Sequence, residues 1–353
     1  MAKVHNYSAG PCILPQEVIK EAAEAVLNFD GLNLSILEIS HRSPNFVAVM
    51  DEAVALVKEL LEVPAGYSVC FAQGGASLGF LMAGYNMIGD HKKSAYLNTG
   101  TWSDKAIKEA HFFGDVDVIG SSKEDNYNHI PKGYTVPTDC DYLHYTSNNT
   151  IFGTQFKEVP NTTIPLVCDM SSDIFSKKVD ISKFDLIYAG AQKNMGPAGA
   201  TLYIIKDEVF TRNRIKIPTM LNIETHVKKD SMFNTPPVYP IYVSMLNLRY
   251  LKSIGGVPAQ QKINEEKARI LYAEIDSNPL FKGVAAVGDR SNMNATFVLT
   301  DESKQAKFDE MCKAANISGI KGHRSVGGYR ASMYNALPVS SVQVLVGVMK
   351  ALD

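Results

Sequence analysis

Two polar residues end apolar runs in the stretch from Pro165 to Thr201. The run LVCD ends in Asp169, and the run DLIYAGAQK ends in Lys193. Short strands that are apolar throughout are usually buried on both faces of a parallel sheet, and residues past their carboxyl ends line the ligand crevice. We therefore expect Asp169 and Lys193 to lie side by side in one cleft.

A buried carboxylate and a buried lysine each need a partner. Pyridoxal phosphate supplies both, because its aldehyde bonds to a lysine and its ring nitrogen pairs with a carboxylate. Each residue has an ordinary alternative: a lysine after a strand is most often solvated, and Asp169 in DMSSD could cap a helix or a turn. The pairing on two neighbouring apolar strands favours the cofactor.

The segment QGGASLGFLMAG predicts a strand-to-helix turn at Gly74, Gly75, Ala76 and Ser77. Small residues there let a phosphate approach the free N–H groups of the first helical turn, and Ser77 adds a hydroxyl. The spacing matches neither a P-loop nor a dinucleotide-binding fingerprint. A plain helix cap is the alternative.

Two further residues could contact a planar ring. Trp102 is the only tryptophan and follows the predicted strand SAYLNTG, where it could stack on the ring or pack in the core. Thr150, in the turn SNNT, could bond a ring substituent or belong to an ordinary turn.

Cationic residues occur in two motifs, HRSP and KGHRSVGGYRAS. They are His41, Arg42, His323, Arg324 and Arg330. Arginine side chains bind carboxylate and phosphate through two parallel hydrogen bonds, so several around one cleft suit a substrate with a carboxylate and a second anionic group. Each of them alone could equally be a solvated surface residue.

The composition excludes several classes of protein. With 353 residues, two domains are expected. The net charge of −2, without basic or acidic blocks, argues against nucleic acid or membranes as partners. No signal peptide or membrane span is visible. The five cysteines are scattered without a C-x-x-C pair, which fits a reduced cytoplasmic location and predicts no metal site.

Strands and helices are expected to alternate along most of the chain, which indicates a parallel α/β sheet. Expected strands are 67–72, 94–100, 116–120, 142–147, 166–169, 185–193, 200–206 and 295–300, with a short extended piece at 36–44. Expected helices are 16–29, 45–62, 75–88, 101–113, 243–254, 258–275, 307–317 and one from about Val339.

Gly255 and Gly256 mark the predicted domain boundary. Residues 16–255 form the large domain, and residues 256–353 form a small α+β domain on which residues 1–15 pack. The irregular stretch 214–240 is expected to be functional or to lie at an interface.

The chain resembles the phosphoserine aminotransferase family, in the class V group of fold-type I pyridoxal-phosphate enzymes. The resemblance runs in order through NYSAGP, ISHRSP, QGGAS, TGTWS, CDMSSDI, YAGAQKNMGPAG, FNTPP and KGHRSVGGYRASMYNA. The resemblance covers nearly the whole length of the chain. The motifs YAGAQKNMGPAG and KGHRSVGGYRAS together are highly specific to the family. It implies a large α/β/α domain around a mostly parallel, mixed sheet.

The resemblance also implies roles for individual residues. Lys193 carries the cofactor, Asp169 pairs with its ring nitrogen, and Trp102 stacks on its ring. The remaining cofactor-binding residues are Ala76, Ser77, Thr150 and Gln192, with Asn234 and Thr235 reaching the phosphate from the neighbouring subunit of a homodimer. Substrate anions are held by Ser8, His41, Arg42, His323, Arg324 and Arg330, with Arg330 on the α-carboxylate.

One departure from the family is visible at Ser77, where some members carry an arginine that assists the phosphate side of the substrate. Its absence leaves more of that work to the other cations. Gly79 also replaces a commonly larger polar residue, and the sequence offers no explanation for it.

The implied reaction transfers the amino group of L-glutamate to 3-phosphohydroxypyruvate, giving O-phospho-L-serine and 2-oxoglutarate in serine biosynthesis. Activity on 4-phosphohydroxy-L-threonine, for vitamin B6 synthesis, is left open. The alternatives are a desulfurase or β-eliminating lyase, an aminotransferase for alanine, serine or glyoxylate, and a non-catalytic protein that keeps the fold. A desulfurase needs a reactive thiol near the site, and no cysteine neighbours KGHRSVGG.

Overall fold

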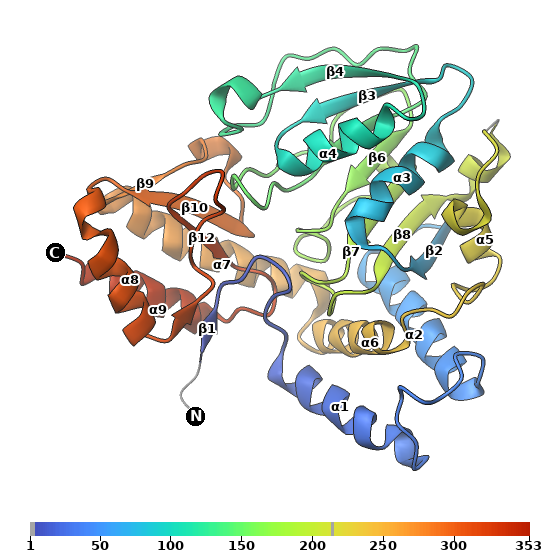
Figure 1. Ribbon diagram of the computed structural model, residues 1–353, viewed down its shortest axis with the longest axis horizontal. Helices are drawn as coiled ribbons and strands as arrows, with labels where there is room; N and C mark the ends of the chain where they lie inside the picture. The colour runs from blue at the N-terminus through green and yellow to red at the C-terminus, as the bar shows by residue number, and fades with distance from the viewer. Residues whose placement is uncertain (1–3, 213–214) are drawn as a thin grey trace.

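A seven-stranded sheet forms the centre of the larger part of the molecule (Figure 1). The computed structural model describes residues 4–212 and 215–353. The strand order is β2-β8-β7-β6-β5-β3-β4. The strands are β2 (Tyr67–Ala72), β3 (Lys93–Asn98), β4 (Asp115–Ser121), β5 (Leu143–Thr146), β6 (Leu166–Asp169), β7 (Leu186–Gly190) and β8 (Thr201–Lys206).

The pairing of these strands is mostly parallel. The pairs from β4 through β7 are parallel, whereas β8 runs antiparallel to both β7 and β2. This confirms the predicted mixed sheet. The carboxyl ends of β5, β6 and β7 consequently meet at one edge, where parallel sheets bind ligands.

Helices cover both faces of the sheet. One core holds residues of α1 (Gln16–Leu27), α2 (Pro44–Leu60) and α6 (Val238–Ser253), and another holds residues of α3 (Gly75–Met87) and α4 (Thr101–Ala110). Successive strand residues enter opposite cores: Cys168 belongs to the first and Val167 to the second. The result is the expected three-layer α/β/α arrangement.

The smaller part contains an antiparallel three-stranded sheet and three helices. The sheet has the order β12-β10-β9, with β9 (Phe281–Gly283), β10 (Asn294–Leu299) and β12 (Tyr329–Ser332). The helices are α7 (Gly256–Ser277), α8 (Gln305–Ala314) and α9 (Val339–Lys350), which share a separate apolar core with the sheet. The predicted α+β character is confirmed.

The N-terminal segment joins this smaller part. Strand β1 (His5–Asn6) pairs in parallel with β11 (Ile317–Ser318), and the Tyr7 hydroxyl donates to the Ser341 carbonyl over 2.7 Å. Helix α7 connects the two cores, since Val257 packs in the larger and Leu271 in the smaller. These contacts support a division near residue 255, which stays a prediction.

Several predicted elements differ from the structure. Residues 36–44 form turns rather than an extended piece, because Ser43 and Pro44 already start α2 and the Ser43 side chain caps it. Helix α6 begins at Val238, five residues before the expected start at residue 243. The stretch 214–240, which was expected to be irregular, contains the short helix α5 (Ile223–Val227). Residue 214 of that stretch is outside the described residues. The short strands β1, β9, β11 and β12 were not predicted.

No helix within residues 4–212 and 215–353 combines the length and apolar character that a membrane span requires.

Candidate active site

The carboxyl edge of the large sheet holds a cavity of about 340 Å³. Asp169 ends β6, and Lys193 lies three residues beyond the end of the neighbouring strand β7. Both line this cavity, as the sequence predicts. The other predicted site residues that line it are Ala76, Ser77, Trp102, Thr150, Gln192, His323 and Arg330.

Size alone does not identify this site. A larger hollow, of about 860 Å³, lies among residues 145–183 and includes Lys157, Asp173 and Lys177. None of the predicted site residues lines it. The smaller cavity is the candidate because it brings together the lysine, the carboxylate, the small-residue turn and the tryptophan.

The amino group of Lys193 is buried and hydrogen-bonded. The residue is only 9% exposed, and its Nζ donates a hydrogen bond to Thr150 Oγ1 over 2.7 Å. Burial, together with the charge of Arg330, lowers the pKa of Lys193 to about 8, although the charge of Asp169 acts in the opposite direction. A substantial fraction of the amine is therefore neutral near physiological pH, as a nucleophile or base requires.

The loop that carries Lys193 is held from several sides. The Cys12 thiol donates to the Lys193 carbonyl over 2.8 Å, and Asn247 Nδ2 donates to the carbonyls of Asn194 and Met195. Gly10 passes so close that a Cβ there would lie 3.4 Å from Lys193 Cγ. The N-terminal segment thus packs directly against the lysine.

The proximity of Cys12 to Lys193 was not predicted. Burial raises the pKa of the Cys12 thiol to about 12, which keeps it protonated. A protonated thiol is a poor nucleophile, so this cysteine does not meet the requirement of a desulfurase.

Asp169 is almost completely buried beneath the cavity. The backbone N–H of Ser171 donates to Oδ1 over 2.9 Å. Burial raises the pKa of Asp169, whereas hydrogen bonding from Ser171 and the charge of Lys193 favour its ionised form. This carboxylate is suited to pair with a cationic ring nitrogen.

The turn before α3 provides backbone donors. Gly74 has φ = 103° and a Cβ there would lie 2.4 Å from Leu78 Cδ2, so only glycine fits. No side chain in the described part of the chain caps the helix. The first-turn N–H groups beside Ala76 and Ser77 can therefore receive an anion, as the sequence predicts.

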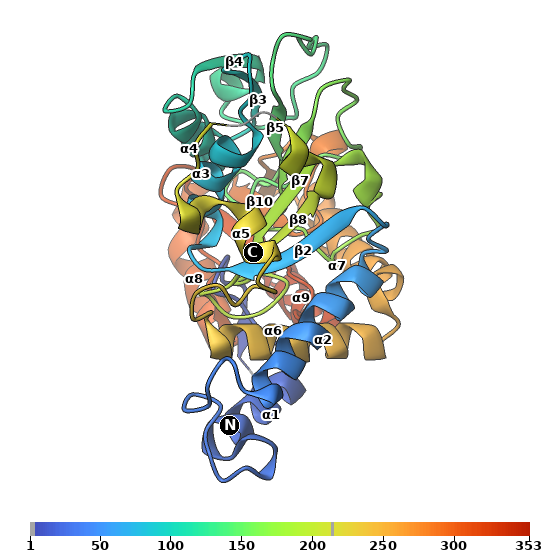
Figure 2. The same cartoon turned by 90° about the vertical axis from the view of Figure 1, so that its right-hand side faces the viewer.

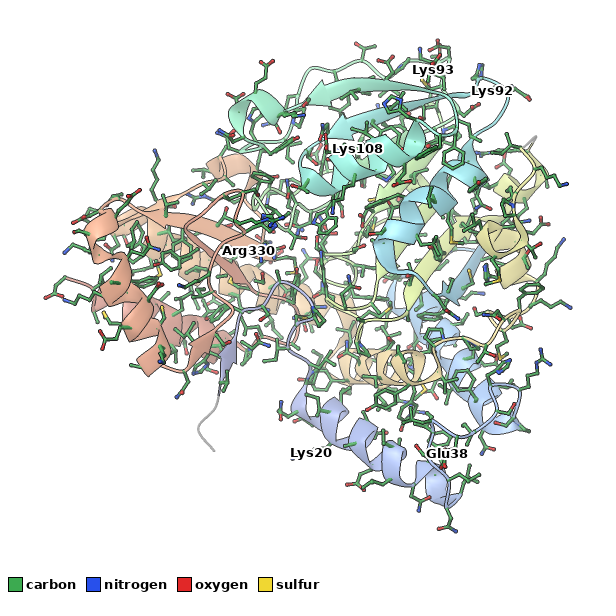
Figure 3. The ribbon with its side chains drawn as sticks, viewed as in Figure 1. Lys20, Glu38, Lys92, Lys93, Lys108 and Arg330 are labelled. Carbon is green, nitrogen blue, oxygen red and sulfur yellow. The ribbon has the colours of Figure 1, made fainter. Side chains whose placement is uncertain are left out.

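Trp102 and the small-domain residues close the other sides of the cavity. Trp102 lies in the first turn of α4, and its Nε1 has no hydrogen-bond partner among the described residues. Arg330, on β12, donates to the Thr150 carbonyl over 3.4 Å. Figure 3 labels Arg330 on the side of the small domain that faces the large one.

Some predicted site residues lie outside the cavity of this chain. These are Ser8, His41, Arg42, Asn234, Thr235 and Arg324. Thr235 is close to the turn, because its carbonyl accepts a 2.7 Å hydrogen bond from Gln73 Nε2. Their predicted roles stay predictions.

Several cavity residues escaped the sequence reasoning. They include Asn148, Ser171 and Ser172. Asn148 Nδ2 donates to Ser172 Oγ over 2.9 Å, which ties the loop after β5 to the loop after β6. The signal was available, since polar residues follow the strand ends in SNNT and DMSSD.

The residues present fit pyridoxal phosphate. The cavity offers an amine, a buried carboxylate, uncapped helix N–H groups and an indole with an unpartnered N–H. These groups match the aldehyde, ring nitrogen, phosphate and ring face of that cofactor. The part of the chain that the structure describes contains no cluster of metal-ligating side chains.

Comparison with known proteins agrees with this chemistry. The family model Aminotransferase class-V matches residues 4–345. The phosphoserine aminotransferase of Flavobacterium psychrophilum is 63% identical over 352 residues and that of Bacteroides thetaiotaomicron 54% over 353, each covering 99% of both chains.

Solved structures agree over the same length. Phosphoserine aminotransferase from Bacillus circulans subsp. alkalophilus superimposes with a TM-score of 0.95 at 41% identity, covering 99% of this chain and 98% of that one. The enzyme from Trichomonas vaginalis, solved with pyridoxal phosphate bound, gives 0.94 at 35% identity, covering 99% and 100%.

Fold and site together define a pyridoxal-phosphate-dependent aminotransferase of fold type I. The chain belongs to the class-V aminotransferase family and, within it, to the phosphoserine aminotransferases.

Proposed function

We propose that this chain catalyses the reversible transfer of an amino group from L-glutamate to 3-phosphohydroxypyruvate, giving O-phospho-L-serine and 2-oxoglutarate. The observation that carries the proposal is the single cavity that Lys193, Asp169, His323 and Arg330 line together. The first two residues serve the transamination chemistry, and the latter two suit a substrate with two anionic groups. The relatives named above share this activity by name.

Lys193 is the residue that moves the proton in this proposal. When bound, pyridoxal phosphate supplies a sink for the electrons of the substrate Cα–H bond. Because its pKa is lowered, the neutral amine of Lys193 can accept the substrate Cα proton at Nζ. It can then return that proton to the carbon of the cofactor that carries the transferred nitrogen. Thr150 orients the amine through its 2.7 Å hydrogen bond.

Asp169 acts as a fixed negative charge. Ser171 orients its carboxylate through the bond to Oδ1, and its burial excludes water from that side. A carboxylate in this position holds a proton on the ring nitrogen opposite. The helix N-terminus at Ala76 and Ser77 positions the phosphate of the cofactor.

Arg330 is assigned to the α-carboxylate of the substrate. Its guanidinium lies beside Thr150, close to Lys193, and a planar guanidinium binds a carboxylate through two hydrogen bonds. The distal anion is assigned to His323 and Arg324 together with His41 and Arg42.

A homodimer would bring the last two residues into the site. Neither His41 nor Arg42 lines the cavity of its own chain, and Figure 3 shows Glu38, three residues before His41, far from Arg330. The buried Nε2 of His41 has no hydrogen-bond partner among the described residues. A second copy can supply both cations, and likewise Asn234 and Thr235, to the neighbouring cavity.

An exposed apolar surface is available for that contact. Within α1 and the following loop, Leu27 is 77% exposed and Leu37 is 61% exposed, and Ile19, Leu32 and Leu34 are also exposed. Figure 2 shows this segment at the lower end of the molecule, beyond α2 and α6. Clustered exposed apolar residues are typical of a protein interface.

The remaining predictions concern context. Residues 16–255 and 256–353 are proposed as the two domains, with residues 1–15 packing on the second, and serine biosynthesis in the cytoplasm is proposed as the setting. The five free cysteines are consistent with a reducing compartment.

A half-reaction tests the function. Purified holoenzyme is mixed with phosphoserine, glutamate, alanine or serine, and the absorbance band of the lysine-linked cofactor is followed. We expect phosphoserine and glutamate to bleach the band at low concentration, because both carry a distal anion. If alanine or serine bleached the band while phosphoserine and glutamate did not, the proposal would be contradicted. The same measurement with 4-phosphohydroxy-L-threonine decides whether that compound is also a substrate.

A further inference from the structure

We propose that Lys105 is a specificity-determining residue that binds the distal anion of the substrate at the entrance of the cavity, an inference that rests on the proposed function. The residue stands one helical turn after Trp102 on α4. Residues three apart on a helix lie on the same face, so Lys105 continues the face that Trp102 presents to the cavity. Its Nζ lies 4.7 Å from the centroid of the Trp102 ring.

The small domain meets this face of α4. Val326, in the turn after His323, packs with Trp102 against the cluster formed by Ile151 and Phe152. His323 itself lines the cavity beside Trp102. Burial is the largest cause of the lowered pKa of His323, followed by the charges of Arg330 and Arg324, and the charge of Lys105 adds a smaller contribution in the same direction. Lys105 and the turn that carries Val326 both lie near Trp102.

Lys105 has no carboxylate partner within residues 4–212 and 215–353, which distinguishes it from Lys108 on the same helix and from Lys123 in the turn after β4. Lys108, the next lysine, pairs with Asp104 at 3.2 Å, and Lys123 approaches the same carboxylate at 3.9 Å. Cations gathered at one entrance without a counter-charge repel one another and bind an anion favourably.

The cavity wall formed by α3 carries no positive charge at position 77, where Ser77 lines the cavity. A lysine stem is long and flexible, so its ammonium can bind an anion from a neighbouring helix. Lys105 thus supplies a positive charge beside Trp102, which lines the same cavity as Ser77.

The test compares Lys105→Met with Lys108→Met in holoenzyme. Apparent dissociation constants are measured in the half-reaction with phosphoserine and with serine, which lacks the distal anion. We expect Lys105→Met to weaken the binding of phosphoserine about three- to tenfold, which is typical of the loss of one partly solvated contact between a charge and an anion. The binding of serine should be unchanged. Lys105→Arg should restore phosphoserine binding, and Lys108→Met should change neither substrate.

An independent readout is the pKa of His323, followed by NMR in the same variants. Removing the positive charge in Lys105→Met should raise that pKa, whereas Lys108→Met should not. Equal weakening of phosphoserine and serine, or no weakening of phosphoserine, would overturn the proposal. If the wild-type enzyme does not react with phosphoserine, the proposed function fails, whatever the two lysine variants do to His323.

Discussion

The Lys193 amine and the Thr150 hydroxyl are 2.7 Å apart, although 43 positions separate the two residues in the chain. Thr150 follows strand β5 and Lys193 follows β7, and both loops leave the same edge of the sheet. The hydrogen bond orients the amine towards the cavity that also contains Asp169 and Arg330. The first predictions follow from this arrangement.

Replacing Lys193 by alanine should abolish turnover and remove the absorbance band of the lysine-linked cofactor, because Lys193 is the only lysine among the described residues that line the cavity. Steady-state assays and a visible spectrum measure both effects. Lys313→Ala, at an exposed position on α8, is the control and should retain both. Turnover that survives in Lys193→Ala would show that the lysine is wrongly assigned.

The lysine should also destabilise the cofactor-free protein. Its pKa is lowered to about 8, so between pH 8 and about 10.5 the unfolded chain binds more protons than the folded protein. Cofactor-free Lys193→Met should therefore be more stable than wild type at pH 7, by up to about 3 kcal/mol.

This difference should shrink as the pH rises towards about 10.5, where the lysine is neutral in both states. Urea unfolding at a series of pH values measures it. Lys313→Met controls for the loss of a surface charge. A difference that stays constant across this pH range would contradict a lowered pKa at Lys193.

Asp169→Asn should lower kcat by about 10²–10³-fold while the fold survives, because an amide cannot hold a proton on the ring nitrogen. Asp173→Asn is a matched control. That carboxylate is equally buried and bonds Gln155 rather than lining the cavity, so it should affect stability more than kcat. Similar kcat losses in both variants would indicate a structural role for Asp169.

Mixing two inactive variants should restore activity if Arg42 acts in the neighbouring subunit. In a hybrid dimer of Lys193→Ala and Arg42→Ala, one site receives both native residues, so random exchange should recover about a quarter of the wild-type rate. A mixture of Lys193→Ala and Asp169→Asn serves as the control, because these residues line the cavity of one chain and no hybrid site is complete. Absence of recovery in the first mixture would place Arg42 elsewhere.

The structure explains Gly79, for which the sequence offered no reason. A Cβ on this residue of α3 would lie 2.6 Å from the ring of Tyr188, so the helix can lie this close to β7 only because the side chain is absent. Gly79→Ala should destabilise the protein by about 1–3 kcal/mol through overpacking.

Gly347→Ala is the matched control for this helix glycine. It lies in α9 with nothing within 4 Å of the added Cβ, and alanine there should stabilise the protein by about 0.5–1 kcal/mol. Thermal unfolding of the two variants should shift in opposite directions. Equal shifts in the two variants would show that the contact with Tyr188 does not prevent residue 79 from carrying a side chain.

The chemical groups of the site could be read from the sequence. Asp169 and Lys193 end apolar runs of the sequence, and the glycines before Ala76 indicate a turn that exposes helix N–H groups. Such features are local, because burial pattern and backbone conformation depend on neighbouring residues. The same local patterns predicted a parallel α/β sheet and most helices of the large domain, whereas the mixed character of the sheet was implied only by the family resemblance.

Tertiary structure alone decided which distant residues meet. The contact of Cys12 with the Lys193 loop, the fit of Gly79 against Tyr188, and the packing of Trp102 and Val326 on one apolar cluster join segments far apart in the chain. Strands β1 and β12 likewise exist only through their partners. Residue types and strand ends follow from short-range patterns, whereas close packing and charge proximity depend on how the whole chain folds.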